Sequence, residues 1–393
     1  MIRTGSDYLS SLDDGRLVWL GSRKVENIAT DRAFRNTASS IAQLYDMNCD
    51  EGDHEILNFR SPQFNCLCHR SFMIPRSHED LAWKRQHHKA WAMESFGFLA
   101  RSPDYMASGL AGFVSRRDVF SGGSFDGAEN VMHLYEAAAR GSLFLAFALT
   151  NPRLDRAASL SQQRKEDAIA VRAIKETDSG IYVSGVKAVA TAAVFADEIL
   201  VGTIEPLPEE DREHALTFYV SPNAPGVSLI SRSSYEASAH SGADHPLSSR
   251  LDENDALLVL ENVFIPWERL LIYRDAARNS AIWWDTPAYI NMAHQASIRF
   301  WTKLEFMAGV AGLIVRSNGL EKIPQAREKL GQLLAHVQTA KSMVLAAETA
   351  HSSLPEDHGV VRLNQDIVYA QRAFAAEVYP KFIHELRMLC GSS

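Results

Sequence analysis

Between residues 167 and 267 the chain consists of short extended segments, with too little sequence between them for crossover helices. Apolar residues fall on one face of 169–173, Asp178-Ser179-Gly180 supplies a turn, and the extended pattern resumes over 181–186, which predicts a hairpin. Strands joined by such short connections pair with antiparallel neighbours. We therefore expect an antiparallel β-barrel or sandwich, with further strands at 198–204, 215–220, 227–230 and 256–263.

Helical periodicity flanks this β region on both sides. From about residue 28 to residue 160, apolar residues recur at every third or fourth position, with few β-branched clusters among them. After Trp267 the helical period returns and covers 292–315, 330–347 and 367–389. The sequence therefore predicts an α+β fold in which helices precede and follow the strands.

The length of 393 residues allows two or three domains. We expect an N-terminal helical domain at 1–160, a β-domain at 161–270 and a C-terminal helical bundle at 271–393. The 292–315 segment carries apolar residues on several faces, as a helix covered by its neighbours or by another subunit would.

Composition excludes several classes of protein. Apolar residues make up 46% of the chain, which excludes disorder as the working state. The net charge of -8, without a long basic run, gives no support for nucleic-acid binding. The four cysteines are too few and too irregularly spaced for a secreted disulfide framework. No signal peptide and no apolar run near the ~20 residues of a membrane span are visible, so we expect a cytoplasmic protein.

Several familiar catalytic motifs are missing. The sequence has no Gly-x-Gly-x-x-Gly, no P-loop, no Gly-x-Ser-x-Gly and no His-Glu-x-x-His. Cys66-Leu67-Cys68-His69 offers thiolates and an imidazole, but no second pair of ligands follows at the spacing of a zinc site. We therefore expect structural cysteines there and no metal site.

One polar cluster stands at a break between apolar helical segments. Arg101-Ser102-Pro103-Asp104-Tyr105 places a guanidinium and a phenol beside a turn-forming proline. Arginine offers a donor fork that suits a carboxylate, a phenolate or a flavin carbonyl, and tyrosine can donate to a developing oxyanion. The alternative is structural: Ser102-Pro103-Asp104 caps the next helix, and Arg101 pairs with a surface carboxylate.

Two further segments could hold a cofactor where helix gives way to sheet. Arg153 and Arg156 follow the pair Asn151-Pro152, and clefts at such junctions are common cofactor sites. The small residues of 185–192 leave room for a flat ring to approach the backbone. Each segment also has a structural explanation, the first as a solvated pair at a helix end and the second as a tightly packed strand.

Taken in this order, these segments match a known family. The chain resembles the oxygenase component of the 4-hydroxyphenylacetate 3-monooxygenase family, the two-component flavin-dependent hydroxylases. The matching pieces span nearly the whole chain. They are Asp14–Trp19, Leu44–Asp46, Arg101–Tyr105, Asn151–Arg156, Gly185–Thr191, His245–Arg250, Glu261–Arg269 and His294-Gln295.

The resemblance implies an acyl-CoA-dehydrogenase-like architecture whose C-terminal bundle assembles homotetramers or homodimers. It also implies reduced FAD, supplied by a separate flavin reductase, and O2 as co-substrate. A flavin C4a-hydroperoxide would then oxygenate a small aromatic or carrier-linked substrate, and the protein must keep water out until that substrate arrives. The separate reductase explains why no dinucleotide-binding motif is present.

The resemblance also implies roles for individual residues. Arg101 and Tyr105 would be catalytic residues that contact substrate and steady the flavin oxygen adduct. The segment from Ser231 to Asp244 would be a mobile substrate cover. The substrate pocket would further include Ser102, Pro103, Asp104 and Phe147, and FAD would be lined by Arg153, Leu154, Asp155, Arg156, Ala190, Thr191 and Ala192.

The chain departs from the family at two points. Phe147 stands where family hydroxylases have a histidine that helps to ionise the phenol, so the candidate replacements are Tyr105, His240 and His245. We therefore expect a neutral substrate, and simple 4-hydroxyphenylacetate to be a poor one. The chain ends at Ser393, whereas family members continue with a tail that contributes to the FAD pocket, so either flavin is held more loosely or the sequence is shortened. The rival hypothesis is a binding-only or non-redox descendant that has lost hydroxylase chemistry.

A related branch, the 4-hydroxybutyryl-CoA dehydratases, holds an iron-sulfur cluster on cysteines and a histidine. His294 is present in this chain, but 100–105 contains no cysteine and Trp301 occupies another position where one is needed. Cluster chemistry is therefore disfavoured.

Overall fold

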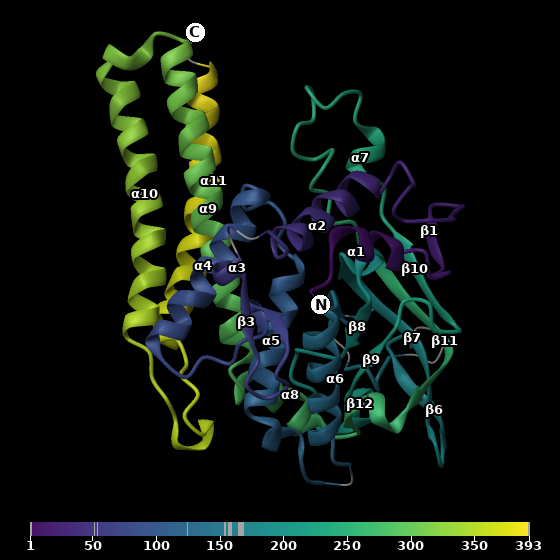
Figure 1. Cartoon of the computed structure of the whole chain (residues 1–393). Helices are drawn as coiled ribbons and strands as arrows, with labels where there is room; N and C mark the ends of the chain where they lie inside the picture. Colours follow the sequence, from purple (N-terminus) through teal and green to yellow (C-terminus); the bar gives the residue numbers. More distant parts are fainter. Residues whose placement is uncertain are drawn as a thin grey trace. The chain divides into compact units, whose positions relative to one another are not determined.

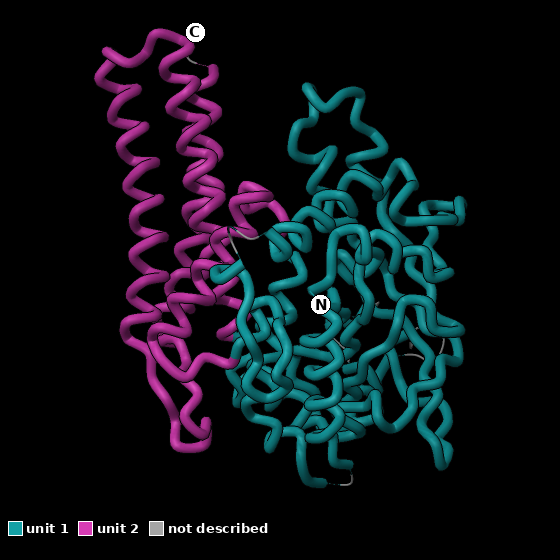
Figure 2. Tube along the Cα trace, viewed as in Figure 1, with its two compact units in different colours: residues 1–73, 101–289 teal, residues 74–100, 290–393 magenta. Residues whose placement is uncertain are grey.

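The computed structural model describes residues 2–50, 52, 54–123, 125–152, 155, 159–163 and 169–391. The chain divides into two compact units, coloured separately in Figure 2. Unit 1 comprises Met1–Met73 and Arg101–Tyr289, and unit 2 comprises Ile74–Ala100 and Ile290–Ser393. Compactness thus groups the N-terminal helices with the strands, and the three-domain division at 160 and 270 stays a prediction.

The described residues of unit 1 form two main sheets, most of whose strands are labelled in Figure 1. The larger sheet has the order β2-β1-β10-β11-β7-β6, the smaller has the order β12-β9-β8-β5, and β3 and β4 form a separate pair. The strands are β1 (Val18–Leu20), β2 (Arg23–Val25), β3 (Asn58–Arg60), β4 (Leu67–His69), β5 (Leu145–Ala148), β6 (Arg172–Thr177), β7 (Gly180–Thr191), β8 (Glu198–Val201), β9 (Leu216–Val220), β10 (Val227–Ser231), β11 (Asp255–Pro266) and β12 (Leu270–Tyr273).

The hairpin predicted at Asp178-Ser179-Gly180 is confirmed as β6 and β7, in which Thr177 pairs with Gly180. Glycine is required at 180 because a Cβ there would lie 2.3 Å from the carbonyl oxygen of Ile265 on β11. The strands expected from 198 to 263 are also found, as β8, β9, β10 and β11.

Two strand pairs differ from the antiparallel packing that the sequence predicts. β1 is parallel to β10, with Val18 opposite Leu229, and β5 is parallel to β8, with Leu145 opposite Glu198. Long stretches of chain separate the two partners in each case, so a crossover connection can join them. Five strands, β1 to β5, also lie within or before the region where the periodicity predicts helices. Within the described residues both sheets keep free edges, and no closed barrel forms.

The helices of unit 1 are α1 (Gly5–Ser11), α2 (Arg35–Met47), α3 (His54–Leu57), α5 (Pro103–Ser115), α6 (Ala128–Gly141), α7 (Tyr235–Ser238) and α8 (Ala276–Trp284). α5 is buried along almost its whole length, which fits its apolar sequence. Close packing requires Gly112 there, because a Cβ would lie 2.4 Å from the backbone nitrogen of Ala288. α5 therefore forms a rigid support for the polar residues at its N-terminus.

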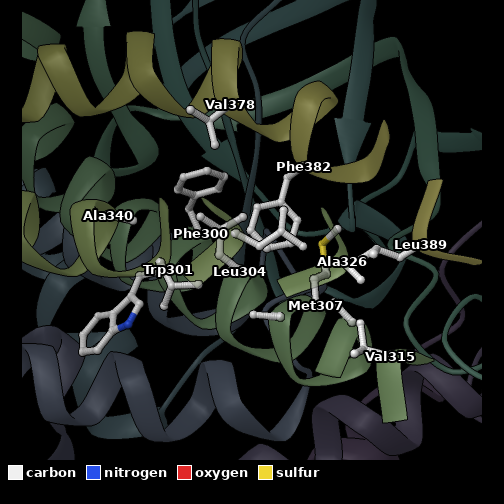
Figure 3. Close-up of a cluster of buried hydrophobic side chains, with 14 residues drawn as sticks. Phe300, Trp301, Leu304, Met307, Val315, Ala326, Ala340, Val378, Phe382 and Leu389 are labelled. Atoms are coloured by element: carbon white, nitrogen blue, oxygen red, sulfur yellow. The ribbon is translucent and has the colours of Figure 1, made fainter. Parts of the chain in front are cut away.

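Unit 2 is helical and is built from α4 (His78–Glu94), α10 (Pro324–Thr349), α11 (Gln365–Gly391) and most of α9 (Ala288–Ser317). The three long helices expected after Trp267 are thus confirmed. Their apolar faces share one buried cluster, shown in Figure 3, in which Leu304 and Phe382 are fully buried. None of the described helices is long and apolar enough to cross a membrane.

Candidate active site at the start of helix α5

The cluster from Arg101 to Tyr105 forms the entry to α5. Pro103 occupies the first turn, where its missing N–H is not needed. Ser102 stands at the N-cap position, but its side chain makes no capping hydrogen bond and instead donates to Asp104 Oδ1 at 2.6 Å. The backbone N–H of Arg101 donates to the Glu253 carboxylate. These two hydrogen bonds fix the backbone at the start of α5. The side chain of Arg101 takes part in neither of them.

The Arg101 side chain lies against two aromatic rings. Its guanidinium carbon is 4.4 Å from the ring centroid of Tyr105 and 5.3 Å from that of Phe147, on β5. The two rings lie 5.9 Å apart at 32°. Arg101 Nε is buried without a hydrogen-bond partner, and the described residues provide no carboxylate that pairs with the guanidinium. The structure thus brings Arg101, Tyr105 and Phe147 together and does not support the alternative of a surface ion pair.

The second predicted segment, Ala190 to Ala192, lies at the end of β7. Ala190 and Ala192 are buried, so only their backbone and the half-buried Thr191 can face a ligand. Val189 and Ala192 both have left-handed backbone conformations, with φ of 53° and 61°. Such strain in residues other than glycine persists only where the surroundings hold it and is typical of functional sites.

The segment 252–255 links these two parts of the site. Glu253 accepts from the backbone of Arg101, whereas Asp255 Oδ1 accepts from the Thr191 hydroxyl at 2.6 Å. The carbonyl of Asn254 accepts from the backbone N–H of Ala192 at 3.1 Å. Sequence reasoning missed Glu253 and Asp255, although an acidic run directly before a strand was a visible signal.

The Asn-Pro segment runs beside β7. The N–H of Ala188 donates to the carbonyl of Thr150 at 3.0 Å, so that the chain just after β5, which carries Phe147, lies next to β7 immediately before Asn151. Of the predicted FAD-binding residues here, Asp155 is exposed. Arg153, Leu154 and Arg156 lie outside the described residues.

A buried lysine joins the same elements. Lys187, on β7, is only 2% exposed, and its Nζ donates to Asn151 Oδ1 at 2.6 Å, to the Gly202 carbonyl and to Thr203 Oγ1 at 3.1 Å. Burial lowers the pKa of Lys187 to about 7, against an opposing effect of the Glu205 carboxylate. Lys187 lies within the Gly185–Thr191 motif, and the sequence alone indicates no role for it.

A buried arginine holds the residues that follow Ala192. Arg16 donates from Nη1 to the carbonyls of Val194 and Ala196 at 2.9 and 2.8 Å. Its other nitrogens bind Asp14 in a bidentate pair at 2.8 Å. This geometry gives the Asp14-Gly15-Arg16 motif a structural role, because it fixes the 3-10 turn Ala193–Phe195 directly after the strained residue.

The expected substrate cover, Ser231 to Asp244, is anchored at its base. The Glu236 carboxylate accepts from the backbone N–H groups of Asn36 and Thr37 at 2.9 and 3.3 Å and so caps α2. The N-cap residue of α2, Phe34, makes no side-chain capping hydrogen bond of its own. Burial raises the pKa of Glu236 to about 7, although these hydrogen bonds lower it. The tip at 240–244 is exposed. Mobility of this segment stays a prediction.

The candidate replacements for the missing histidine differ in position. Tyr105 contacts Phe147, and its hydroxyl makes no hydrogen bond to the described residues. The rings of His240 and His245 lie 6.5 Å from each other, and among the described contacts neither reaches Phe147. Tyr105 is therefore the one of the three that the geometry favours.

His294 lies in unit 2 and is engaged there. Its Nε2 lies 2.8 Å from Glu348 Oε1, and Arg85 Nε donates to the same carboxylate at 2.9 Å. These contacts lower the pKa of Glu348 against the effect of its burial. Within unit 2 His294 thus belongs to a buried ionic network.

The site geometry fits a flat, partly anionic ligand. Arg101 Nε is a buried donor without a partner, the adjoining strand end is built of small residues, and Thr191 is half-buried beside them. A buried donor left unmatched is costly unless a ligand uses it. These residues can bind and orient a ring system with carbonyl oxygens, and among them only Tyr105 can pass a proton.

The fold of this chain is similar to that of acyl-CoA dehydrogenases. It is similar to glutaryl-coenzyme A dehydrogenase with a TM-score of 0.57 at 14% identity, over 82% of this chain and 74% of that chain. This likeness concerns the fold alone.

Two family models then identify the chain more closely. The model described as 4-hydroxyphenylacetate 3-hydroxylase N terminal matches residues 4–272, and the C-terminal model of the same family matches 279–393. The chain belongs to the 4-hydroxyphenylacetate 3-hydroxylase family. The resemblance drawn from its motifs is confirmed.

Individual relatives cover most of the chain. The pyoverdin chromophore biosynthetic protein PvcC of Pseudomonas aeruginosa is 35% identical over 88% of this chain and 69% of its own length. A Streptomyces globisporus monooxygenase named for a chlorinated hydroxyphenyl substrate on a peptidyl-carrier protein is 33% identical, over 97% of this chain and 71% of its own. The oxygenase component HpaB, solved with FAD and 4-hydroxyphenylacetate, has a TM-score of 0.93 at 29% identity, over 99% of this chain and 80% of that chain.

Proposed function

We propose that this chain is the oxygenase component of a two-component flavin-dependent monooxygenase that oxygenates a small aromatic or carrier-linked substrate. The observation that carries the proposal is the cluster of Arg101, Tyr105 and Phe147 beside the strained end of β7. Family membership supports it, together with the FAD and 4-hydroxyphenylacetate bound to HpaB and the carrier-linked substrate in the name of the Streptomyces relative.

When bound, reduced FAD supplies two electrons to O2, so that one oxygen atom enters the substrate and the other leaves as water. The residues of this chain bind and orient the flavin and the substrate and shield them from water. The unpartnered Nε of Arg101 donates to an anionic or carbonyl oxygen, and its charge stabilises negative charge that develops nearby. Thr191 and the backbone at Val189 and Ala192 support the flavin ring system, and FAD contacts from Arg153 to Arg156 remain part of the proposal.

Two residues shape the substrate end of the site. Tyr105 and Phe147 form an aromatic wall, against which a substrate ring can stack with a gain of about 0.5–1.5 kcal/mol beyond its burial. Phe147 cannot accept a proton, so a phenol must bind neutral or pass its proton on through another group. Among the described residues Tyr105 contacts Phe147, and its hydroxyl can relay a proton to a further acceptor. We therefore propose a neutral aromatic substrate. Simple 4-hydroxyphenylacetate is expected to be a poor one.

Partners and assembly complete the proposal. A separate flavin reductase supplies reduced FAD, either by diffusion or by transient contact. A homotetramer or homodimer would cover apolar side chains on the long helices of unit 2, where Leu313, Leu334 and Met388 are at least half exposed.

A turnover assay tests the proposal. The protein is combined with NADH, catalytic FAD and an unrelated flavin reductase, and neutral phenols are offered both free and as carrier-linked thioesters. We expect substrate-dependent product and less hydrogen peroxide than the reductase alone releases. If the chain neither binds flavin nor changes peroxide release with any of these substrates, the binding-only alternative replaces the proposal.

A further inference from the structure

The buried ammonium of Lys187 links three chain segments by hydrogen bonds. It contacts Asn151, at the start of the Asn-Pro segment, and Gly202 and Thr203, directly after β8. Lys187 itself lies on β7, three residues before Ala190. One side chain therefore ties together the two segments that flank the proposed flavin site and the first residues of the connection that follows β8.

The acceptors around Lys187 are themselves fixed. Asn151 Nδ2 donates to Thr203 Oγ1 at 3.2 Å, and Asn279 Nδ2 donates to the Thr203 carbonyl at 2.8 Å. Asn279 in turn accepts from the hydroxyl of Thr217 at 2.9 Å. A buried network whose members are all satisfied makes the backbone around it rigid. An ammonium has three donors, and here three acceptors meet it.

The position of Lys187 is not one that packing alone favours. Along β7 the residues that face the core alternate, and Ile181 and Val183 are fully buried on that face. Lys187 lies on the same face, four residues after Val183. An apolar side chain at this position would avoid the cost of burying a charge. Its contacts connect β7 with Asn151 in the Asn-Pro segment and with Gly202 and Thr203 after β8, which points to positioning as its role.

We infer that Lys187 is a positioning residue that sets the geometry of the flavin-binding segments through Asn151, Gly202 and Thr203. The inference rests on the proposed function and deepens it, because it concerns how this chain holds the flavin. Lys187 need not touch the flavin itself. When Lys187 loses its proton, the neutral amine has only two N–H donors for its three acceptors. One of the three hydrogen bonds is then lost.

Among the described residues, Glu205 and His214 interact electrostatically with Lys187. The Glu205 carboxylate attracts the ammonium, and His214, whose pKa is lowered by burial and to a smaller degree by Lys187, lies in the 3-10 turn Glu209–His214. Since the pKa of Lys187 lies at about 7, flavin affinity in the wild type should fall as the pH rises through that value.

The test compares Lys187→Met with Lys175→Met by equilibrium dialysis against oxidised and reduced FAD. Lys175 is exposed on the neighbouring strand β6, so the same substitution there controls for a lost surface charge. At pH 6.5 we expect Lys187→Met to bind FAD at least tenfold more weakly than the wild type, and Lys175→Met to stay within twofold. Between pH 6 and pH 8.5 the wild-type dissociation constant should rise, whereas that of Lys187→Met should stay flat.

Two further measurements keep the inference open to refutation if Lys187→Met folds poorly. Thr203→Val removes one acceptor with little change of shape and should weaken FAD binding several-fold, and the wild-type pH profile needs no variant. If Lys187→Met or Thr203→Val lowers only the melting temperature, with unchanged FAD affinity, or if the wild-type profile is flat, the inference is wrong. If the wild type binds FAD in neither redox state, the proposed function is wrong, and the inference about Lys187, which depends on it, is wrong as well.

Discussion

Replacing Arg101 with methionine removes the one guanidinium that lies, among the described residues, against both Tyr105 and Phe147, and it keeps an apolar stem. Nothing among the described residues pairs with this guanidinium, so its donors are available to a ligand. Arg101→Met should therefore reduce binding of flavin or substrate much more than it reduces folding stability.

The size of the effect follows from the contacts. A charge-assisted hydrogen bond to a bound ligand contributes about 1.5–3 kcal/mol, which corresponds to a loss of about 10–150-fold in affinity. Folding loses the two ring contacts at 4.4 and 5.3 Å, worth about 1–2 kcal/mol. It also regains the cost of the buried, unpartnered Nε, so the net change in the free energy of unfolding should stay within about 1 kcal/mol.

Arg140→Met is the matched control. Arg140 also lies over an aromatic ring, that of Phe64 at 5.2 Å, and pairs with Glu136 on α6. Equilibrium dialysis against reduced FAD and a neutral phenol, with urea unfolding of each variant, separates binding from folding. Equal ligand affinity in Arg101→Met and Arg140→Met would refute the reasoning about Arg101.

Three further changes test other parts of the account. Phe147→His should raise turnover of simple phenols, because an imidazole can accept the phenol proton; wild-type turnover that is already efficient and unchanged by the substitution would contradict this. Arg16→Met should lower the free energy of unfolding by about 1–3 kcal/mol, since it leaves the buried carbonyls of Val194 and Ala196 without the donors that Arg16 supplies. A urea midpoint equal to that of the wild type would show that these hydrogen bonds of Arg16 do not stabilise the fold. Glu236 has a folded pKa raised to about 7 by burial, so the protein loses stability as the pH rises from about 4.5 to 7. Glu236→Gln should therefore be more stable than the wild type at pH 8 but not at pH 4, because glutamine does not ionise. If the free energies of unfolding of the two proteins in urea changed with pH in parallel, this prediction would be wrong.

The sequence predicts those parts of the fold that depend on local patterns. The turn at 178–180 and the long helices after Trp267 follow from periodicity and turn residues, which act over a few positions. Periodicity does not report which strand pairs with which. For that reason the parallel pairing of Val18 with Leu229 was not foreseen.

The candidate site shows the same division. Arg101 and Tyr105 stand close together in the chain, and the resemblance to a family added Phe147. Glu253 and Lys187 were missed because their roles depend on contacts with residues far away in the sequence, such as Arg101 and Asn151. One local signal did exist: Lys187 interrupts the buried face of β7 at a position where the alternation requires an apolar residue.

The most direct test of the central claim is a single-turnover experiment with labelled oxygen. The protein is loaded anaerobically with reduced FAD and a neutral phenol, free or carrier-linked, then mixed with 18O2, and the products are analysed by mass spectrometry. The account predicts a product that carries one 18O atom, formed without any reductase and in yield limited by the bound flavin. Oxidation of all the flavin with release of hydrogen peroxide, and no labelled product from any phenol offered, would contradict it.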